Sequence, residues 1–166
     1  MSTPQQQDDE EVPSPDEAPA PAQGSGIERV PLFVAIQRMT VAERMQFARR
    51  TDKEGRGLLI RDSNKQVALA ALGNPKLTIQ EVEQFAKSRQ LGTDLLREIA
   101  SNVDWMKHYT VVQALAANPK TPLPMAIKML PRLKTLDLKL LGADRNLPSA
   151  IRIGAARLFK ARSERG

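Results

Sequence analysis

Residues Val67 to Lys76, VALAALGNPK, return as Val111 to Lys120, VVQALAANPK. Five of the ten positions are identical, and all but one of the others exchange one apolar or small residue for another. The two copies lie 44 residues apart, a period typical of stacked helical repeats. In each copy an apolar helix is predicted to end at Asn, because the Pro that follows cannot continue it. The repeated stretch therefore predicts an all-α fold of short helical units.

Helix-start signals recur along the rest of the chain. Residues 40–43 (TVAE) and 78–81 (TIQE) both have the spacing of a capping box, in which Thr and Glu satisfy the first N–H groups of a helix. Thr121 is followed by Pro122, a favoured residue at a first helical position. Residues 52–56 are expected to form a charged turn before a short helix at 58–60. Turns are predicted about every 12 to 16 residues along the chain.

The first 26 residues differ from the rest in composition. They carry six acidic residues, five prolines and no Lys or Arg. Such a segment cannot bury enough apolar surface to offset its ordering entropy, so we expect an acidic disordered tail at 1–26. The helical repeat domain is then predicted at 27–163. The tail is expected either to add solubility or to lie across the domain as an electrostatic mask.

The predicted domain is strongly basic. All 25 Lys and Arg residues fall within 27–166, together with 13 acidic residues. This charge favours anionic partners, whether nucleic acid, lipid headgroups or acidic protein segments. The alternative is that Lys and Arg simply keep the helices soluble.

Several chemistries find no support in the residues present. The chain has no Cys and a single His, so thiolate metal sites and His clusters are excluded. No apolar run reaches the length of a membrane span, and no Gly-rich phosphate loop or paired-carboxylate spacing is found. We expect a cytoplasmic protein that is not an enzyme and has no cofactor and no metal. The sequence leaves the oligomeric state open.

Three phrases carry a resemblance to a known class: LGNPKLTIQEV, LAANPKTPLPMA and LGADRNLPSAI. They resemble the leucine-rich-repeat-variant style of HEAT-like α-solenoids, over about residues 58–160. The resemblance implies a right-handed α-solenoid of short stacked helices that acts as an interaction scaffold. Some variant-repeat proteins carry a cysteine-ligated iron–sulfur module, which this chain lacks the cysteines to build. The 44-residue period leaves open whether each unit holds two or three helices.

Two sets of residues are candidates for binding. Lys76 and Lys120 occupy the same place in equivalent turns, and Arg145 lies near that place, so stacking is expected to align them as a basic edge. The alternative is that these side chains are merely solvated. A polar-aromatic cluster is expected where two repeats meet: Asp104, Trp105, His108 and Tyr109. It is interpreted mainly as a plug between repeats, with a binding or catalytic role as the alternative.

The sequence thus favours a non-enzymatic adaptor or scaffold that binds another protein. The alternative is a nucleic-acid-binding protein that uses the basic surface of the repeat domain.

Overall fold

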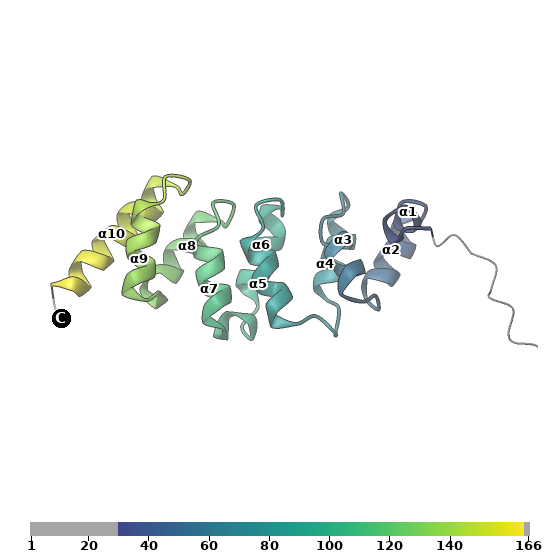
Figure 1. The fold of residues 1–166 in the computed structure, drawn as a ribbon, viewed down its shortest axis with the longest axis horizontal. Helices are drawn as coiled ribbons and strands as arrows, with labels where there is room; N and C mark the ends of the chain where they lie inside the picture. The colour runs from purple at the N-terminus through teal and green to yellow at the C-terminus, as the bar shows by residue number, and fades with distance from the viewer. Residues whose placement is uncertain (1–29, 165–166) are drawn as a thin grey trace, which may run out of the picture. The chain divides into compact units, whose positions relative to one another are not determined.

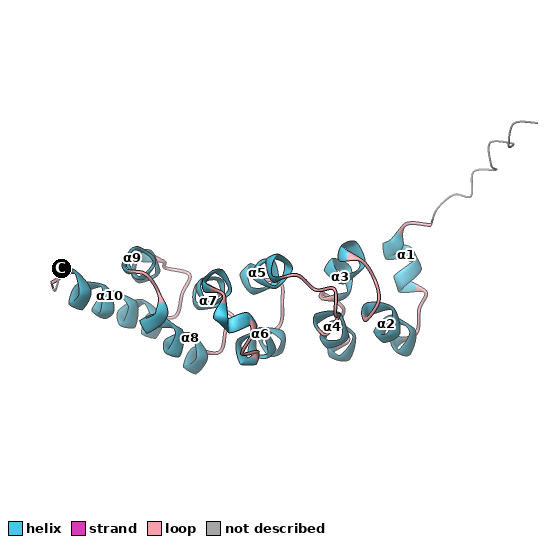
Figure 2. Cartoon of the chain, turned by 90° about the horizontal axis from the view of Figure 1, so that it is seen from below, coloured by secondary structure: helices cyan, strands magenta, loops and turns pink. Residues whose placement is uncertain are grey.

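The computed structural model describes residues 30–164, and every regular element in that range is helical (Figure 1, Figure 2). The all-α prediction is confirmed for this part of the chain. The predicted acidic tail, 1–26, and the first residues of the predicted domain lie outside the described residues. None of the helices between residues 30 and 164 is long and apolar enough to cross a membrane.

The helices are short and most are separated by tight turns. In chain order the α-helices are α1 (Leu32–Gln37), α2 (Val41–Ala48), α3 (Lys53–Leu59), α4 (Lys65–Leu72), α5 (Ile79–Lys87), α6 (Thr93–Ser101), α7 (Tyr109–Ala116), α8 (Leu123–Met129), α9 (Thr135–Ala143) and α10 (Ser149–Ser163). Two 3₁₀ helices, η1 (Trp105–Lys107) and η2 (Leu130–Arg132), precede α7 and α9.

Both predicted capping boxes form. At the start of α2, Glu43 accepts a bond from the Thr40 backbone N–H at 2.7 Å while the Thr40 hydroxyl accepts from the Glu43 N–H. Thr78 and Glu81 make the same reciprocal bonds at the start of α5. Each box satisfies N–H groups that the first turn leaves without an intrahelical partner, so it fixes where the helix begins.

The two copies of the repeated stretch form α4 and α7, and they are buried in the same way. Each helix buries five residues, and all five positions correspond at the 44-residue offset: Val67, Ala68, Ala70, Ala71 and Leu72 in α4; Val111, Val112, Ala114, Leu115 and Ala116 in α7. The sequence repeat is therefore accompanied by a repeated pattern of buried positions in the two helices.

Helix α4 is apolar on most of its surface because it belongs to two hydrophobic clusters. Val67, Ala70 and Ala71 pack into a cluster with residues of α1 to α3. Ala68 and Leu72 pack into the larger cluster, which continues through α10. Among the closest helix pairs are α2 with α4, α5 with α7 and α9 with α10, all near one another in the sequence. A helix with neighbours on two sides has no face left for polar residues.

The number of helices between turns differs along the chain. Three α-helices, α5, α6 and α7, separate the first Asn-Pro-Lys turn (74–76) from the second (118–120). Only α8, η2 and α9 separate the second turn from the related turn at 144–146. The number of α-helices between successive turns is therefore three in the first interval and two in the second.

The prediction of a charged turn at 52–56 is wrong. Helix α3 already begins at Lys53, because the Asp52 side chain accepts from the Gly55 N–H at 3.0 Å and caps the helix. A Cβ at Gly55 would lie 1.9 Å from the Thr51 hydroxyl oxygen. Gly55 is therefore needed for the close approach of α3 to the preceding turn.

Candidate functional site: two repeated corners

The Asn side chain of each Asn-Pro-Lys turn hydrogen-bonds to the end of an earlier helix. It therefore joins the end of α4 to the end of α2, and the end of α7 to the end of α5. Asn74 donates its side-chain amide to the carbonyl oxygens of Ala48 at 2.8 Å and Thr51 at 3.2 Å, at the end of α2. Its own side-chain oxygen accepts from the Lys76 N–H at 2.8 Å. Asn74 is 4% exposed, so these bonds replace water that the end of α2 would otherwise need.

Asn118 makes the same bonds one repeat later. Its side-chain amide donates to the carbonyl oxygens of Ala86 at 2.7 Å and Ser88 at 3.0 Å, at the end of α5, and its oxygen accepts from the Lys120 N–H at 3.0 Å. The Asn side chain is required because it offers a donor and an acceptor together.

The third turn keeps only half of this arrangement. Asp144 accepts from the Asn146 N–H at 2.9 Å, as the two Asn residues do two positions ahead, but a carboxylate has no amide to donate. The carbonyls of Pro131 and Leu133, after α8, accept instead from the Arg162 guanidinium of α10. The third helix end is therefore held by the last helix.

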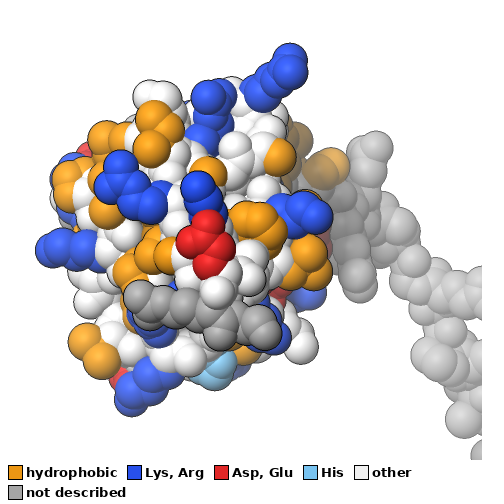
Figure 3. Space-filling view, turned by 90° about the vertical axis from the view of Figure 1, so that its left-hand side faces the viewer, with side chains coloured by type: hydrophobic (Ala, Val, Ile, Leu, Met, Phe, Trp, Pro, Cys, Tyr) orange, Lys and Arg blue, Asp and Glu red, His pale blue; other side chains and the backbone are white. Residues whose placement is uncertain are grey.

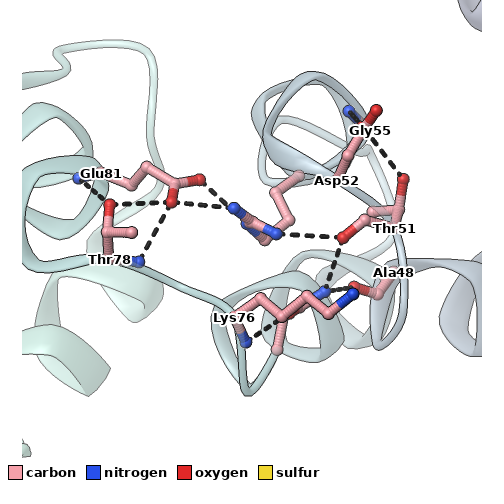
Figure 4. A network of polar contacts seen from close by, with 9 residues as sticks. Ala48, Thr51, Asp52, Gly55, Lys76, Thr78 and Glu81 are labelled. Atoms are coloured by element: carbon pink, nitrogen blue, oxygen red, sulfur yellow. Dashed lines mark hydrogen bonds and ion pairs between the residues drawn. The ribbon is translucent and has the colours of Figure 1, made fainter.

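A buried ion pair lies beside the hydrogen bonds that Asn74 makes to the end of α2 (Figure 4). Arg56, from α3, donates to both Glu81 carboxylate oxygens at 2.9 Å and to the Thr51 carbonyl at 3.0 Å. Burial alone would raise the pKa of Glu81, but the bonds from Arg56 and Thr78 outweigh it and hold that pKa below its ordinary value. The pair joins α3 to α5 and leaves the Arg56 charge compensated, so it is structural rather than available to a ligand.

Basic side chains gather where each Asn fastens a helix end. The first corner consists of Arg49, Arg50 and Lys76: the first two lie between the carbonyls that bind Asn74, and Lys76 is bonded to Asn74 through its N–H. The second corner consists of Lys87, Arg89 and Lys120: Lys87 lies between the carbonyls that bind Asn118, Arg89 directly follows the second of them, and Lys120 is bonded to Asn118 through its N–H. All six side chains are exposed.

A hollow lies beside each corner. The first hollow measures about 440 Å³ and is lined by Arg49 together with Leu69, Ala70 and Gly73 of the α4 end, among others. The second measures about 350 Å³ and is lined by Lys87 and Arg89 together with the residues that correspond to those three at the 44-residue offset: Gln113, Ala114 and Ala117. The chain thus presents the same kind of hollow twice.

The corners and hollows combine a basic rim with a floor of small or apolar side chains. Within residues 30–164, the only ion pair formed by a corner residue joins Lys87 to Glu83. The remaining five charges are turned to solvent and available to an anion. Such an arrangement suits a carboxylate or phosphate on the rim and a small apolar group on the floor.

The predicted basic edge is placed in part. Lys76 and Lys120 are exposed and occupy equivalent positions, but Asn146, not Arg145, follows two residues after the turn-forming Asp144. Arg145 is exposed at the position that corresponds to Pro75 and Pro119. The turn-forming Asn residues also join Lys76 and Lys120 to helix ends that carry further basic residues, Arg49 and Arg50 at the first turn and Lys87 and Arg89 at the second.

The sequence contained a signal for those missed residues. Basic residues lie at the ends of α2 and α5: Arg49 and Arg50 directly follow α2 in ARRT at 48–51, and Lys87 ends α5 and Arg89 follows it in AKSR at 86–89. Lys and Arg are common at helix C-terminal ends, because their positive charge is favourable next to the negative end of the helix dipole. Their presence there does not by itself indicate a binding site. Their link to the Asn-Pro-Lys turns depends on a side-chain bond between residues 23 to 32 positions apart.

The predicted polar-aromatic cluster has no common focus. Asp104 is exposed and pairs with Lys107 at 2.7 Å, and His108 is exposed at the start of α7. Tyr109 turns the other way and donates its hydroxyl to Asp137 of α9. Trp105 and Tyr109 are both half-buried and pack against the larger hydrophobic cluster.

The environment of Tyr109 changes its acidity. Burial raises the pKa of the Tyr109 hydroxyl, and its bond to Asp137 raises that pKa further, against the opposing effect of the Lys134 N–H that donates to the hydroxyl oxygen. The Lys134 ammonium lies 5.0 Å from the centre of the Tyr109 ring. These contacts join α7 to α9.

One further surface is apolar without a partner in the described chain. Leu136 and Leu140, one turn apart on α9, are 66% and 60% exposed, whereas Leu138 and Leu141 of the same helix are buried. At the C-terminal end, apolar side chains lie among Lys and Arg side chains (Figure 3). Two exposed leucines on one helix face add a second surface suited to protein contact.

Neither a metal site nor a similarity to known proteins points to a further site among the described residues. Among the described residues no three His, Asp or Glu side chains come together to hold a metal ion. No protein-family model, no curated protein and no solved structure matches the chain. Among the described residues, the two corners and their hollows are therefore the candidate functional site.

Proposed function

We propose that this protein is a non-enzymatic helical-repeat scaffold that binds another protein, and that its helices form a right-handed α-solenoid of the HEAT-like kind. The observation that carries the proposal is the presence of two similar hollows, each next to a turn that a buried Asn joins to an earlier helix end. Repetition of a concave, basic-rimmed surface suits a partner segment that crosses both units.

The chemistry of the hollows defines the partner. Their floors, of Leu69, Ala70 and Gly73 in the first and of Gln113, Ala114 and Ala117 in the second, leave room for small aliphatic side chains, and Arg49 in the first and Arg89 in the second supply guanidinium groups for carboxylates. We infer an extended acidic segment that alternates aliphatic and acidic residues. Its charge would match the exposed basic side chains around it.

Site-directed photocrosslinking tests this proposal. A photoreactive residue replaces Gln66, which is exposed and lines the first hollow, in the full chain expressed in its source cells. The proposal expects one protein to be crosslinked, with its acidic segment at the crosslink, and expects Arg49→Glu to abolish the product. The matched control places the same reactive residue at exposed Gln84, which lines neither hollow. Equal products from both positions, or none sensitive to Arg49→Glu, would contradict it.

Nucleic-acid binding is the second candidate. It is favoured by the exposed Lys and Arg side chains that form no ion pair with the described carboxylates. Salt separates the two candidates, because release of counterions makes affinity for nucleic acid fall steeply with ionic strength. If the chain retains a single-stranded oligonucleotide with a steep salt dependence and the photocrosslinks are to nucleic acid, the second candidate replaces the first.

A further inference from the structure

A separate hollow beside Trp105 has the opposite character from the two corners. It measures about 410 Å³ and lies between the end of α4, α6 and η1. Its lining consists of Leu69 and Leu72 from α4, Gly73 and Asn74 directly after α4, Glu98 from α6, and Asn102 and Trp105. Leu69 and Gly73 also line the first hollow, so the two hollows meet at the end of α4. No Lys or Arg lines it, whereas the first and second hollows are both lined by basic side chains.

Two features make this hollow electronegative. Glu98 is exposed and forms no ion pair with the described Lys and Arg residues, so its charge faces the open space. The C-terminal end of α4 also borders the hollow, and the last carbonyl groups of a helix carry a partial negative charge. Arg97, the adjacent basic residue on α6, is directed to Asp94 instead.

The backbone that carries Trp105 is fixed at the edge of this space. The Asn102 side-chain oxygen accepts from the backbone N–H of Trp105 at 3.1 Å and from the backbone N–H of Asp104 at 3.0 Å, at the start of η1. The ring is half-buried against the hydrophobic cluster and therefore has few alternative positions. An indole face attracts cations more strongly than any other side-chain ring.

We propose that the Trp105 hollow binds an organic cation, the ammonium or guanidinium group of a Lys or Arg side chain on a partner. Glu98 supplies the charge, Trp105 the aromatic face and the α4 end further carbonyl oxygens. This site goes beyond the proposed function, because its ligand has the opposite charge from the segment expected at the two corners.

The single Trp of the chain reports on this site directly. Trp105 fluorescence of the full chain is titrated with N-acetyl-arginine methylamide, N-acetyl-lysine methylamide and spermidine. The proposal expects a saturable change with at least one blocked amino acid, and Glu98→Gln is expected to weaken it about fivefold or more. Tighter binding of the blocked amino acids than of spermidine assigns a protein side chain as the source; the reverse assigns a free amine.

Two controls isolate the charge. N-acetyl-citrulline methylamide has nearly the shape of the arginine probe without its charge and should give no saturable change. Glu54→Gln removes an exposed carboxylate from α3, outside the hollow, and should leave binding unchanged. Circular dichroism checks that both variants keep their helices. Equal responses to citrulline and arginine, equal affinities of Glu98→Gln and the unaltered chain, or no response to any cation would overturn the proposal. These outcomes do not depend on crosslinking at Gln66.

Discussion

Asn74 and Asn118 are buried one repeat apart and make the same three hydrogen bonds, two as donor to the end of an earlier helix and one as acceptor from the N–H two residues ahead. The sequence repeat is thus maintained by a bond pattern as well as by apolar packing. Because the donors reach back 23 to 32 residues, each Asn closes a unit that α-helical hydrogen bonds alone would leave open.

Replacing Asn118 with Ala should lower the free energy of unfolding by about 2–4 kcal/mol, because the carbonyls of Ala86 and Ser88 lose their donor at a buried site. Urea denaturation followed by circular dichroism measures the change. Asp144→Ala is the matched control at the third turn, where only local bonds are lost. A smaller loss for Asn118→Ala than for Asp144→Ala would show that the fastening bonds contribute little.

The buried ion pair should behave as a coupled unit. Arg56→Met leaves the Glu81 carboxylate without its partner at a site that is 3% exposed, and should cost about 3–5 kcal/mol. Glu81→Met should cost a similar amount. The double variant should be more stable than the sum of the single losses predicts, since it buries no uncompensated charge. Losses that add in denaturant titrations would argue against coupling.

The fold was largely predictable from local patterns. Both capping boxes and the Asn-Pro-Lys turns carry their own backbone chemistry, so helix starts and ends could be read from a few neighbouring residues. The start of helix α3 was placed too late in the sequence, because Gly55 and Gly57 are residues typical of a turn. Gly55 serves a close approach to Thr51 that only the three-dimensional structure reveals.

The candidate site was less predictable because it depends on distant residues. Lys76 and Lys120 were selected from the repeat, but their neighbours at the corners come from the ends of α2 and α5. The sequence also grouped Trp105 with Tyr109, and both pack against the larger hydrophobic cluster, but the hydrogen bond of the Tyr109 hydroxyl to Asp137 of α9 had no local signal. The sequence did not predict that Glu98 lies beside Trp105, because a single exposed Glu is common on helices and no motif links it to Trp105.

Tyr109 should titrate above its ordinary pKa of 10.0 in the folded protein. It is the only Tyr in the chain, so ultraviolet absorbance of the phenolate follows it alone. Asp137→Asn should move its pKa back toward the ordinary value. Because the folded-state pKa is raised, the stability contributed by Tyr109 is present below pH 10 and is lost as pH rises through the folded-state pKa. A Tyr109 pKa that Asp137→Asn leaves unchanged would contradict this explanation.

The two faces of α9 should differ in their tolerance of substitution. Leu136→Ala removes an exposed side chain and should change the free energy of unfolding by less than about 0.5 kcal/mol. Leu138→Ala opens a cavity in the larger hydrophobic cluster and should cost about 2–5 kcal/mol. Denaturant titration of both variants makes the comparison within one helix. Comparable losses would mean that the outer face of α9 is already packed.

The central claim is that the two corners bind one acidic segment, and fluorescence anisotropy tests it most directly. A labelled twelve-residue peptide of alternating Leu and Glu is titrated with the full chain, beside its Leu and Gln counterpart. We predict saturable binding of the acidic peptide and none of its Gln counterpart. The double variant Arg49→Glu with Arg89→Glu should lower the affinity for the acidic peptide about tenfold or more. Lys128→Glu with Arg157→Glu, which changes the net charge equally on exposed residues of α8 and α10, should weaken it much less. Equal weakening by both pairs, or equal binding of the two peptides, would contradict the account.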